Sequence, residues 1–297
     1  MVKVYVVSGL GIGCHEEAAH AYKRAGAEAE IIHIRQLLSG EKKLFNSQIL
    51  NFSGGFLHGD ILGAGMCAAN ELEHASIADG EGKKRIKDLL VEYAQKGNII
   101  YGQCNGFQLL VKTGLLPGID GDYSRQTITL THNNYGIYRV DCVLHKIEEH
   151  DGKPHFAFER IDDPDLRLWC RHGEGKIQFY SDFGLISKEE GEKNRKIVNE
   201  RHVLLRYADP STMKATEKFP ENPNGSVDGI AGLVDPTGNI FGHMAHPEVS
   251  IYLSRNPEFF YAKDRLRRDG IKAEDISNEF LEDVGLQVFR NIVNRFR

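Results

Sequence analysis

The sequence predicts an α/β fold: a mostly parallel sheet flanked by helices, with added β-hairpins on one edge. In the first 112 residues, short apolar runs alternate with amphipathic segments, which is the pattern of strands joined by helices. These runs are almost continuously apolar, as expected of parallel strands buried on both faces. Residues 127–169 hold shorter β-rich runs separated by turn residues, and these predict the hairpins.

The elements of the first part follow from apolar runs and from the residues that end them. The strand at 2–7 stops at Ser8 and Gly9, and the amphipathic helix at 16–24 stops at Gly26. The same reasoning predicts further strands at 29–34, 48–52 and 98–102, and helices at 61–72, at 83–96 and from 107 onward.

The second part reads as short strands followed by a polar helix, then a loop, two further strands and a C-terminal helix. Several proline residues and Gly225 make 209–226 a loop, and a Pro-Thr-Gly turn separates two apolar strands. Because no repeat or long linker interrupts the chain, we expect one domain over residues 1–297. The predicted elements are short strands at 127–131, 136–144, 156–161 and 166–169, a polar helix at 188–199, strands at 230–234 and 240–243, and an amphipathic helix at 273–296.

Composition narrows the class of protein. Hydrophobic residues make up 41% and charged residues 27% of the 297, which is ordinary for a soluble globular protein. A net charge of −5 gives no indication of a nucleic-acid or membrane surface. No apolar stretch approaches the roughly 20 residues that span a bilayer, and the apolar N-terminal run is too short for a signal peptide. The five scattered cysteines form no CxxC pair, so we expect reduced thiols and a cytoplasmic location.

The segment around Cys104 carries the clearest chemical signal. An apolar strand runs into Gly102-Gln103-Cys104-Asn105-Gly106, and a helix follows at once. This is the cysteine counterpart of the nucleophile elbow, in which flanking glycines permit a sharp turn. The helix dipole and free backbone N–H groups at such a place favour a thiolate. Packing as a small hydrophobe suits Cys67, Cys142 and Cys170 better than Cys104, because packing does not require glycine on both sides.

Two further segments could complete a catalytic site. His246 and Glu248 lie two residues apart after the strand at 240–243, so the carboxylate could orient the imidazole as a base. With 13 histidines in the chain, this spacing alone is a modest signal, and His243 reads as structural. The pair Gly54-Gly55 at the end of another strand could offer a backbone N–H to an oxyanion, or could simply form a tight turn.

Taken together and in this order, these segments resemble the triad-type (class I) glutamine amidotransferases. The closer resemblance is to the family of glutaminase subunits of phosphoribosylformylglycinamidine synthase. It runs from about residue 2 to about residue 295, and the elbow with the Asn-Pro-Asn-Gly-Ser phrase is its most specific part. The matching phrases are Gly54–Asp60, Cys104–Gln108, Gly114–Gly118, His172–Gly175, Asn222–Ser226 and His246–Glu248.

The resemblance implies the roles of the site residues. Cys104 would attack the carboxamide of glutamine, with His246 as base and then acid and Glu248 orienting His246. Backbone N–H groups of Gly55 and Asn105 would hold the oxyanion. Gln108 would contact the substrate glutamine.

The resemblance also implies the partners of the chain. Ammonia would pass to a synthetase subunit that aminates formylglycinamide ribonucleotide, and a small accessory subunit is compatible with such a complex. ATP and Mg²⁺ would belong to the synthetase, so we expect no cofactor or metal in this chain, which has no P-loop. We expect no nucleic-acid or membrane partner.

The chain departs from the family pattern at several positions. Gln103 stands where a small or aliphatic residue is usual before the nucleophile, and the first turn reads Leu10–His15 where the family has a Pro-Gly-x-Asn-Cys-Asp pattern. His58, Gly63 and Ala245 also differ from the expected residues. None of these changes removes one of the predicted catalytic groups.

Other readings of the same residues stay open at this point. A glutamine amidotransferase for another acceptor, a related cysteine hydrolase, and a regulatory subunit without turnover all fit the elbow. A dinucleotide-binding protein fits less well. Gly9, Gly11 and Gly13 follow a strand, but Cys14 occupies the position next to them where the fingerprint would continue, and the second strand ends in Ile34-Arg35 without a ribose-binding acid.

Overall fold

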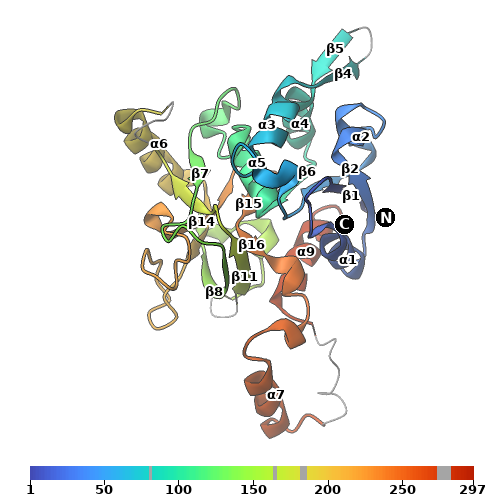
Figure 1. Ribbon diagram of the computed structural model, residues 1–297. Helices are drawn as coiled ribbons and strands as arrows, with labels where there is room; N and C mark the ends of the chain where they lie inside the picture. The colour runs from blue at the N-terminus through green and yellow to red at the C-terminus, as the bar shows by residue number, and fades with distance from the viewer. Residues whose placement is uncertain (80–81, 163–165, 181–185, 273–281) are drawn as a thin grey trace.

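Ten strands form one mixed sheet in the computed structural model of the chain, which describes residues 1–79, 82–162, 166–180, 186–272 and 282–297. The strands of this sheet are β1 (Lys3–Ser8), β2 (Glu28–His33), β3 (Ile49–Phe52), β6 (Ile99–Gln103), β8 (Arg139–Ile147), β11 (Arg167–His172), β13 (Val203–Tyr207), β14 (Ile230–Val234), β15 (Ile240–His243) and β16 (Ala245–His246). Their order across the sheet is β16-β11-β8-β13-β14-β15-β6-β3-β1-β2. Figure 1 labels most of these strands.

The strands β2, β1, β3, β6 and β15 run parallel to one another. Phe52 pairs with Gly102, and Gln103 pairs with His243, so the carboxyl ends of β3, β6 and β15 meet at one edge of the sheet. In open α/β sheets this edge is where ligands bind. The segments that follow these strands contain Gly54, Cys104 and His246.

The other half of the sheet is antiparallel. Strands β14, β13, β8, β11 and β16 continue the sheet beyond β15, each antiparallel to its neighbour. The α/β class and the addition on one edge are therefore confirmed, with the added strands joined into the main sheet. Three separate two-stranded sheets accompany it: β4 (Ser76–Asp79) with β5 (Gly82–Arg85), β7 (Thr129–Thr131) with β12 (Lys176–Gln178), and β9 (Glu149–His150) with β10 (Lys153–Pro154).

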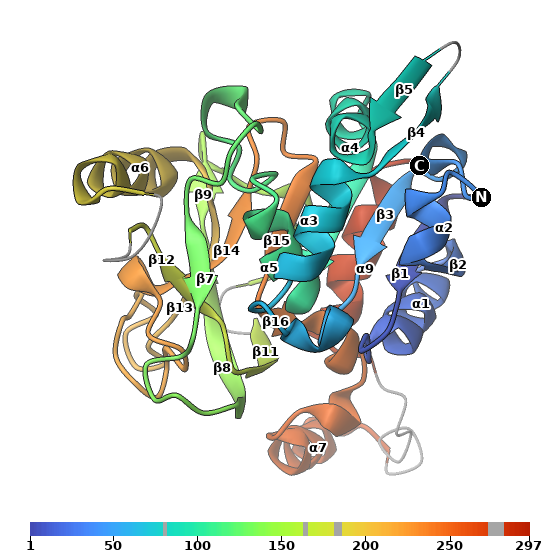
Figure 2. The same ribbon diagram turned by 45° about the horizontal axis from the view of Figure 1, so that its top comes forward.

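Helices cover both faces of the sheet (Figure 2). Apolar side chains of α3, α4, α5 and α6 join the core on one face, and those of α1 and α9 join the core on the other. The helices are α1 (His15–Arg24), α2 (Ile34–Leu38), α3 (Met66–His74), α4 (Ile86–Gln95), α5 (Asn105–Lys112), α6 (Lys188–Arg201), α7 (Phe259–Arg268) and α9 (Val284–Asn294).

The two cores follow from the alternation of side chains along each strand. In β1, Tyr5 and Val7 enter the core beneath α3 to α5, whereas Val4 and Val6 enter the core beneath α1 and α9. Both sets are almost fully buried, which is why a parallel strand reads as a continuous apolar run.

Several predicted elements begin later than the sequence pattern indicated. The helix expected at 61–72 starts at Met66, because Gly63 and Gly65 adopt positive φ angles of 104° and 74° that interrupt a helix. The helix expected at 83–96 starts at Ile86, because Lys83–Arg85 pair with β4 as a hairpin strand.

The strand expected at 156–161 is wrong. Phe156–Phe158 form a turn of 3₁₀ helix, η4, in which the N–H of Ala157 donates to Nδ1 of the capping residue His155 at 3.3 Å. The sequence reading did not predict α2, α7 or β13, nor the short strands β4, β5, β9, β10, β12 and β16. The C-terminal helix is confirmed from Val284, where the Asp283 carboxylate accepts a hydrogen bond from the N–H of Val284 at 2.8 Å. Residues 273–281 of that prediction lie outside the described residues.

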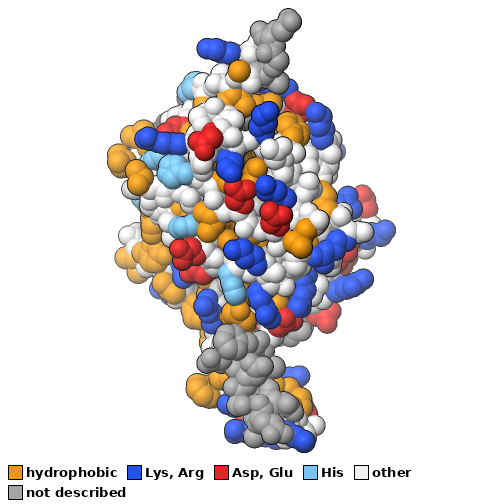
Figure 3. Space-filling view, turned by 90° about the vertical axis from the view of Figure 1, so that its right-hand side faces the viewer, with side chains coloured by type: hydrophobic (Ala, Val, Ile, Leu, Met, Phe, Trp, Pro, Cys, Tyr) orange, Lys and Arg blue, Asp and Glu red, His pale blue; other side chains and the backbone are white. Residues whose placement is uncertain are grey.

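The surface carries both signs of charge. On the face drawn in Figure 3, Lys and Arg side chains are interspersed with Asp and Glu side chains. Helix α7 projects from the rest of the molecule, and none of its residues is buried (Figure 1). None of the helices in the described part of the chain combines the length and apolarity that a bilayer-spanning segment requires.

Candidate active site

Cys104 occupies the sharp turn that the sequence predicted. It is the residue between β6 and α5, with φ of 50° and ψ of −107°, a conformation that non-glycine residues rarely adopt. Its own N–H donates to the carbonyl of His243 at 2.9 Å, which fixes the turn against β15. A Cβ at Gly106 would stand 2.0 Å from the carbonyl oxygen of Phe52, so glycine is required there for α5 to approach β3. Strain of this kind persists where surrounding structure enforces it, often at active sites.

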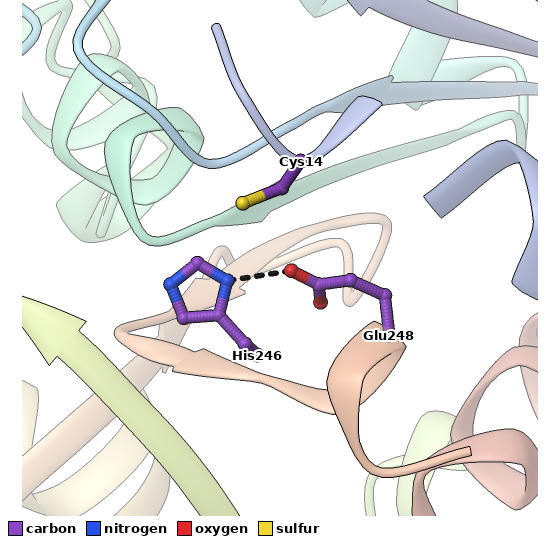
Figure 4. Close-up of side chains that lie close together, drawn as sticks. All are labelled: Cys14, His246 and Glu248. Carbon is purple, nitrogen blue, oxygen red and sulfur yellow. Dashed lines mark hydrogen bonds and ion pairs between the residues drawn. The ribbon is translucent and has the colours of Figure 1, made fainter. Parts of the chain in front are cut away.

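His246 and Glu248 form a buried pair. Nδ1 of His246 lies 2.5 Å from Oε1 of Glu248, and neither side chain is more than 2% exposed (Figure 4). His246 ends β16, and Glu248 lies in the next turn, η7 (Pro247–Val249). The ring is therefore held by its Nδ1, which leaves Nε2 for chemistry.

The free nitrogen of His246 faces the region of Cys104. Nε2 is buried and has no hydrogen-bond partner among the described residues. Gly54 brings the two groups together: a Cβ at Gly54 would stand 2.6 Å from Cε1 of His246 and 3.3 Å from Cβ of Cys104. Burial by itself lowers the pKa of His246, but the charges of Glu248 and Cys104 outweigh burial and raise the pKa well above its usual value. A cysteine and a histidine with these properties can act as nucleophile and base.

A cavity of about 250 Å³ opens over Cys104. Larger hollows lie beside the 236–238 turn, beside α7 and beside α4, but none of these three contains Cys104. The cavity over Cys104 combines a nucleophile with a few polar groups, as binding sites for small molecules do. Its other lining residues are Gly55, Phe56, Asp60, Ala64, Gln108, His132, Gly136, Ile137, Tyr138, Arg171, His172, Gly173 and Glu174.

Of the two residues whose backbone groups are predicted to hold an oxyanion, Gly55 belongs to the cavity lining and Asn105 directly follows Cys104. Gly55 has a φ of 148° and pairs with Ile12 in an isolated β-bridge. The hydrogen bonds of that bridge come from the N–H groups of Gly13 and Phe56, not from Gly55. Asn105 is the first residue of α5, where a backbone N–H has no partner within the helix.

The side chain of Asn105 joins the glycine loop to α5. Its Oδ1 accepts from the N–H of Leu57 at 2.9 Å, and its Nδ2 donates to Asp60 at 3.1 Å and to Oε1 of Gln108 at 2.9 Å. Gln108 also donates to the carbonyl of Glu174. The predicted substrate-contacting Gln108 thus lines the cavity, while both ends of its amide already bond to the protein.

Cys14 and Arg171 were not assigned to the site by the sequence. Cys14 Sγ would be 3.3 Å from a Cβ at Gly54, and it accepts from the Arg171 guanidinium at 3.7 Å. The carbonyl of Arg171 lies 3.6 Å from Sγ of Cys104. The sequence could have indicated that Cys14 lies near the site, because it follows β1 at the same edge of the sheet as Cys104. Arg171 stands in the antiparallel half, and its position depends on strand pairing.

Cys14, His246 and Glu248 also place potential metal-binding atoms within 4.8 Å of one another (Figure 4). The 2.5 Å contact between His246 and Glu248 leaves no space for an ion between them. The arrangement is that of a hydrogen-bonded imidazole and carboxylate. His172, from the matching phrase His172–Gly175, lines the cavity and hydrogen-bonds to Asn133 at 3.3 Å.

The fold and the site together define a glutamine amidotransferase with a cysteine elbow. Residues 1–291 match the model of the CobB/CobQ-like glutamine amidotransferase domain, and the chain belongs to this family. The residues proposed from sequence as nucleophile and base are the ones that the fold brings together around Gly54.

Individual relatives point to one member of the family. The chain is 36% identical over 295 residues to the phosphoribosylformylglycinamidine synthase subunit PurQ of Methanococcus maripaludis, covering 99% of this chain and 97% of the relative. It is 34% identical to the subunit of the same name from Dehalococcoides mccartyi, with 98% and 96% covered. A solved structure of PurLQS from Thermotoga maritima matches with a TM-score of 0.61 and 25% identity, covering 100% of this chain and 99% of that one.

Proposed function

We propose that this chain is the glutaminase component of phosphoribosylformylglycinamidine synthase. It hydrolyses glutamine through a thioester on Cys104 and passes ammonia to a synthetase subunit, which aminates formylglycinamide ribonucleotide. The family membership and the names of the relatives support this assignment. One observation carries the catalytic roles: Nε2 of His246 is buried and unpartnered beside Cys104, while Glu248 holds Nδ1.

In the first step, Sγ of Cys104 attacks the carboxamide carbon of glutamine, and Nε2 of His246 accepts the thiol proton. The carbonyl oxygen becomes an oxyanion, which accepts hydrogen bonds from the N–H groups of Gly55 and Asn105. Removing one such donor commonly costs about 3 kcal/mol of transition-state stabilisation. His246 then gives its proton to the leaving nitrogen, the C–N bond breaks, and ammonia departs from a glutamyl thioester on Cys104.

In the second step, water attacks the thioester carbonyl while Nε2 of His246 accepts a proton from the water. The C–S bond breaks, His246 returns the proton to the departing sulfur, and glutamate leaves. Glu248 stabilises the imidazolium that forms in each step and keeps one ring orientation throughout. Water and glutamine are consumed, and glutamate and ammonia are produced.

We further propose that the synthetase binds over the mouth of the cavity and carries the ATP and Mg²⁺ that amination requires. Several apolar side chains in and next to the segments that line the mouth are exposed, and such side chains mark an interaction surface when they are contiguous. Phe56, Ile137 and Tyr138 belong both to the cavity lining and to this exposed set. The apolar rim is defined as Phe56, Ile61, Leu62, Tyr135, Ile137, Tyr138 and Val140, which are 49% to 80% exposed.

Labelling with an electrophilic glutamine analogue tests the nucleophile. We expect one adduct, on Cys104, that excess glutamine suppresses and that mass spectrometry locates. Complexes with the synthetase then test the acceptor: Cys104→Ala loses glutamine-dependent amination of formylglycinamide ribonucleotide but keeps ammonia-dependent amination. Labelling of Cys104 that excess glutamine does not suppress would contradict the proposed roles in glutamine hydrolysis. A complex that does not aminate formylglycinamide ribonucleotide would contradict the assignment to phosphoribosylformylglycinamidine synthase.

Charge substitutions test the docking face. Ile61→Asp or Ile137→Asp should weaken the complex at least tenfold, because an ionised carboxylate would have to be desolvated in an apolar contact. Phe260→Asp is the matched control, since Phe260 is 79% exposed on α7 and stands outside the apolar rim. Binding lost with Phe260→Asp and retained with the rim variants would move the docking face to α7.

A further inference from the structure

A row of buried polar side chains extends from α1 to Glu248. The hydroxyl of Tyr22 donates to Oδ1 of Asn51 at 3.1 Å, and Nδ2 of Asn51 donates to Oε1 of Gln103 at 3.1 Å. Nε2 of Gln103 then donates to Oε2 of Glu248 at 2.9 Å. All four side chains are fully buried. They come from α1, β3, β6 and η7, so only the folded sheet brings them into line.

The carboxylate sets the direction of every hydrogen bond in this row. An ionised carboxylate can only accept, so the amide of Gln103 must turn its NH₂ toward Glu248. The amide oxygen of Gln103 then faces Asn51, which must donate with its own NH₂ and accept from Tyr22. Oε1 of Glu248 accepts from His246, and Oε2 accepts from Gln103, so each oxygen has a different donor.

The position of Gln103 links the nucleophile to the residue that orients the base. It immediately precedes Cys104, at the last position of β6, and it pairs with His243 of β15. Burying an amide is costly unless its groups are hydrogen-bonded. Here both ends of the amide are used, and one end supports the carboxylate that orients His246. A small aliphatic side chain at residue 103 would leave Oε2 of Glu248 without this donor.

We propose that Gln103 is a positioning residue for glutamine hydrolysis, which holds the Glu248 carboxylate in the orientation that fixes the His246 ring. This inference rests on the catalytic roles proposed above. Gln103 touches neither Nε2 of His246 nor the sulfur, and it acts through Glu248. A hydrogen bond donated to a carboxylate also stabilises its charged form, so loss of the donor changes how strongly Glu248 binds the protonated imidazole.

The first test replaces Gln103 with methionine, which has similar length and volume but no hydrogen-bonding amide. A hydrogen bond to a charged group corresponds to about a ten- to hundredfold effect, so we expect Gln103→Met to lower kcat by that factor. We expect KM for glutamine to stay within about twofold, because Gln103 does not line the cavity. The acidic limb of the kcat pH profile should move upward, because the less stabilised carboxylate holds the imidazolium more tightly.

The second test replaces Gln103 with glutamic acid, which keeps the shape and exchanges the donor for a carboxylate. At pH 8 two carboxylates would face each other, and we expect a larger loss than with methionine. As the pH falls, the pair takes up one proton, an O–H donor returns, and the ratio of variant to unmodified activity should rise. A purely structural role for Gln103 would not produce this recovery.

Asn194→Leu is the matched control, because Asn194 is a buried amide whose Nδ2 bonds to the carbonyl of Thr127 away from the site. It should lower stability without changing the pH profile. Unchanged kcat and pH profile in Gln103→Met, or a Gln103→Glu ratio that stays flat with pH, overturns the inference. Cys104→Ala measured in parallel separates the cases: if it still hydrolyses glutamine, the proposed function fails, and otherwise the failure concerns Gln103 alone.

Discussion

Gly54 leaves the space that the His246 ring occupies. A Cβ on Gly54 would stand 2.6 Å from Cε1 of His246, closer than Cβ atoms approach other heavy atoms, and 3.3 Å from Cβ of Cys104. The glycine therefore decides whether imidazole and thiol can share one side of the turn. Gly55, beside it, is constrained differently, because its Cβ would meet backbone atoms of residues 11–13 at 2.6 to 2.7 Å.

Gly54→Ala is expected to lower glutaminase kcat at least a hundredfold. The added methyl group displaces the His246 ring, and a misplacement of about 1 Å can cost that factor. Gly13→Ala is the control in the neighbouring loop, since a Cβ there meets nothing within 4 Å. Steady-state kinetics with circular dichroism for folding make the comparison. Equal activities of the two variants would contradict the packing argument.

Glu248→Gln should lower kcat by about 10³- to 10⁴-fold, as removal of a ring-orienting carboxylate does in comparable sites. The same change should lower the pKa of His246. Burial lowers that pKa, and the Glu248 charge is the largest influence that opposes burial. NMR titration of the His246 ring in a Cys104→Ala background would follow it. A pKa that does not move would show that Glu248 does not set the charge of this ring.

Cys14→Ser is expected to retain activity within about fivefold, whereas Cys104→Ser should lose it. Both cysteines lie beside Gly54, but only Cys104 has the strained φ of the elbow and lines the cavity. Alkylation rates in the two variants would check the assignment. A Cys14→Ser protein that is as inactive as Cys104→Ser would make Cys14 part of the chemistry.

Three buried histidines (His145, His172 and His243) and the partly buried His155 should make the fold sensitive to acid. Burial lowers the pKa of His145 and His155 to about 4 and of His172 and His243 to about 3. Below pH 6.5 these histidines bind protons in the unfolded chain but stay neutral in the folded chain. The free energy of unfolding therefore falls as the pH drops from 6.5 toward 4.

The loss approaches about 1.4 kcal/mol per pH unit for each such histidine. Denaturant titrations at pH 7, 6 and 5 would measure it. His155→Phe should reduce the dependence of the unfolding free energy on pH by the contribution of one histidine, because phenylalanine binds no proton. The new ring can keep the packing of the His155 ring on Phe156 and Phe241. An unchanged slope in His155→Phe would contradict the assignment of proton uptake to that residue.

Local sequence determined the parts of this protein that depend on neighbours in the chain. Glycines on both sides of Cys104 define the elbow, and the spacing of His246 and Glu248 places imidazole and carboxylate in one turn. Apolar runs located the parallel strands, because each such strand is buried on both faces regardless of its partner. β14 is antiparallel to its neighbours, but every residue of β14 and β15 is buried, and both strands have the boundaries that the sequence predicted.

Only the tertiary structure decided which distant groups meet. Phe156–Phe158 has strand-like composition but forms a 3₁₀ turn capped by His155, and Lys83–Arg85 leaves a helical pattern to pair with β4. Gln103 and Glu248 are 145 residues apart, and their contact depends on the order of β3, β6 and β15. The periodicity of apolar residues indicates which face of a helix or strand is buried. It does not indicate which other element packs against that face. The presence of Cys14 and Arg171 beside Cys104 was therefore set by sheet order and packing.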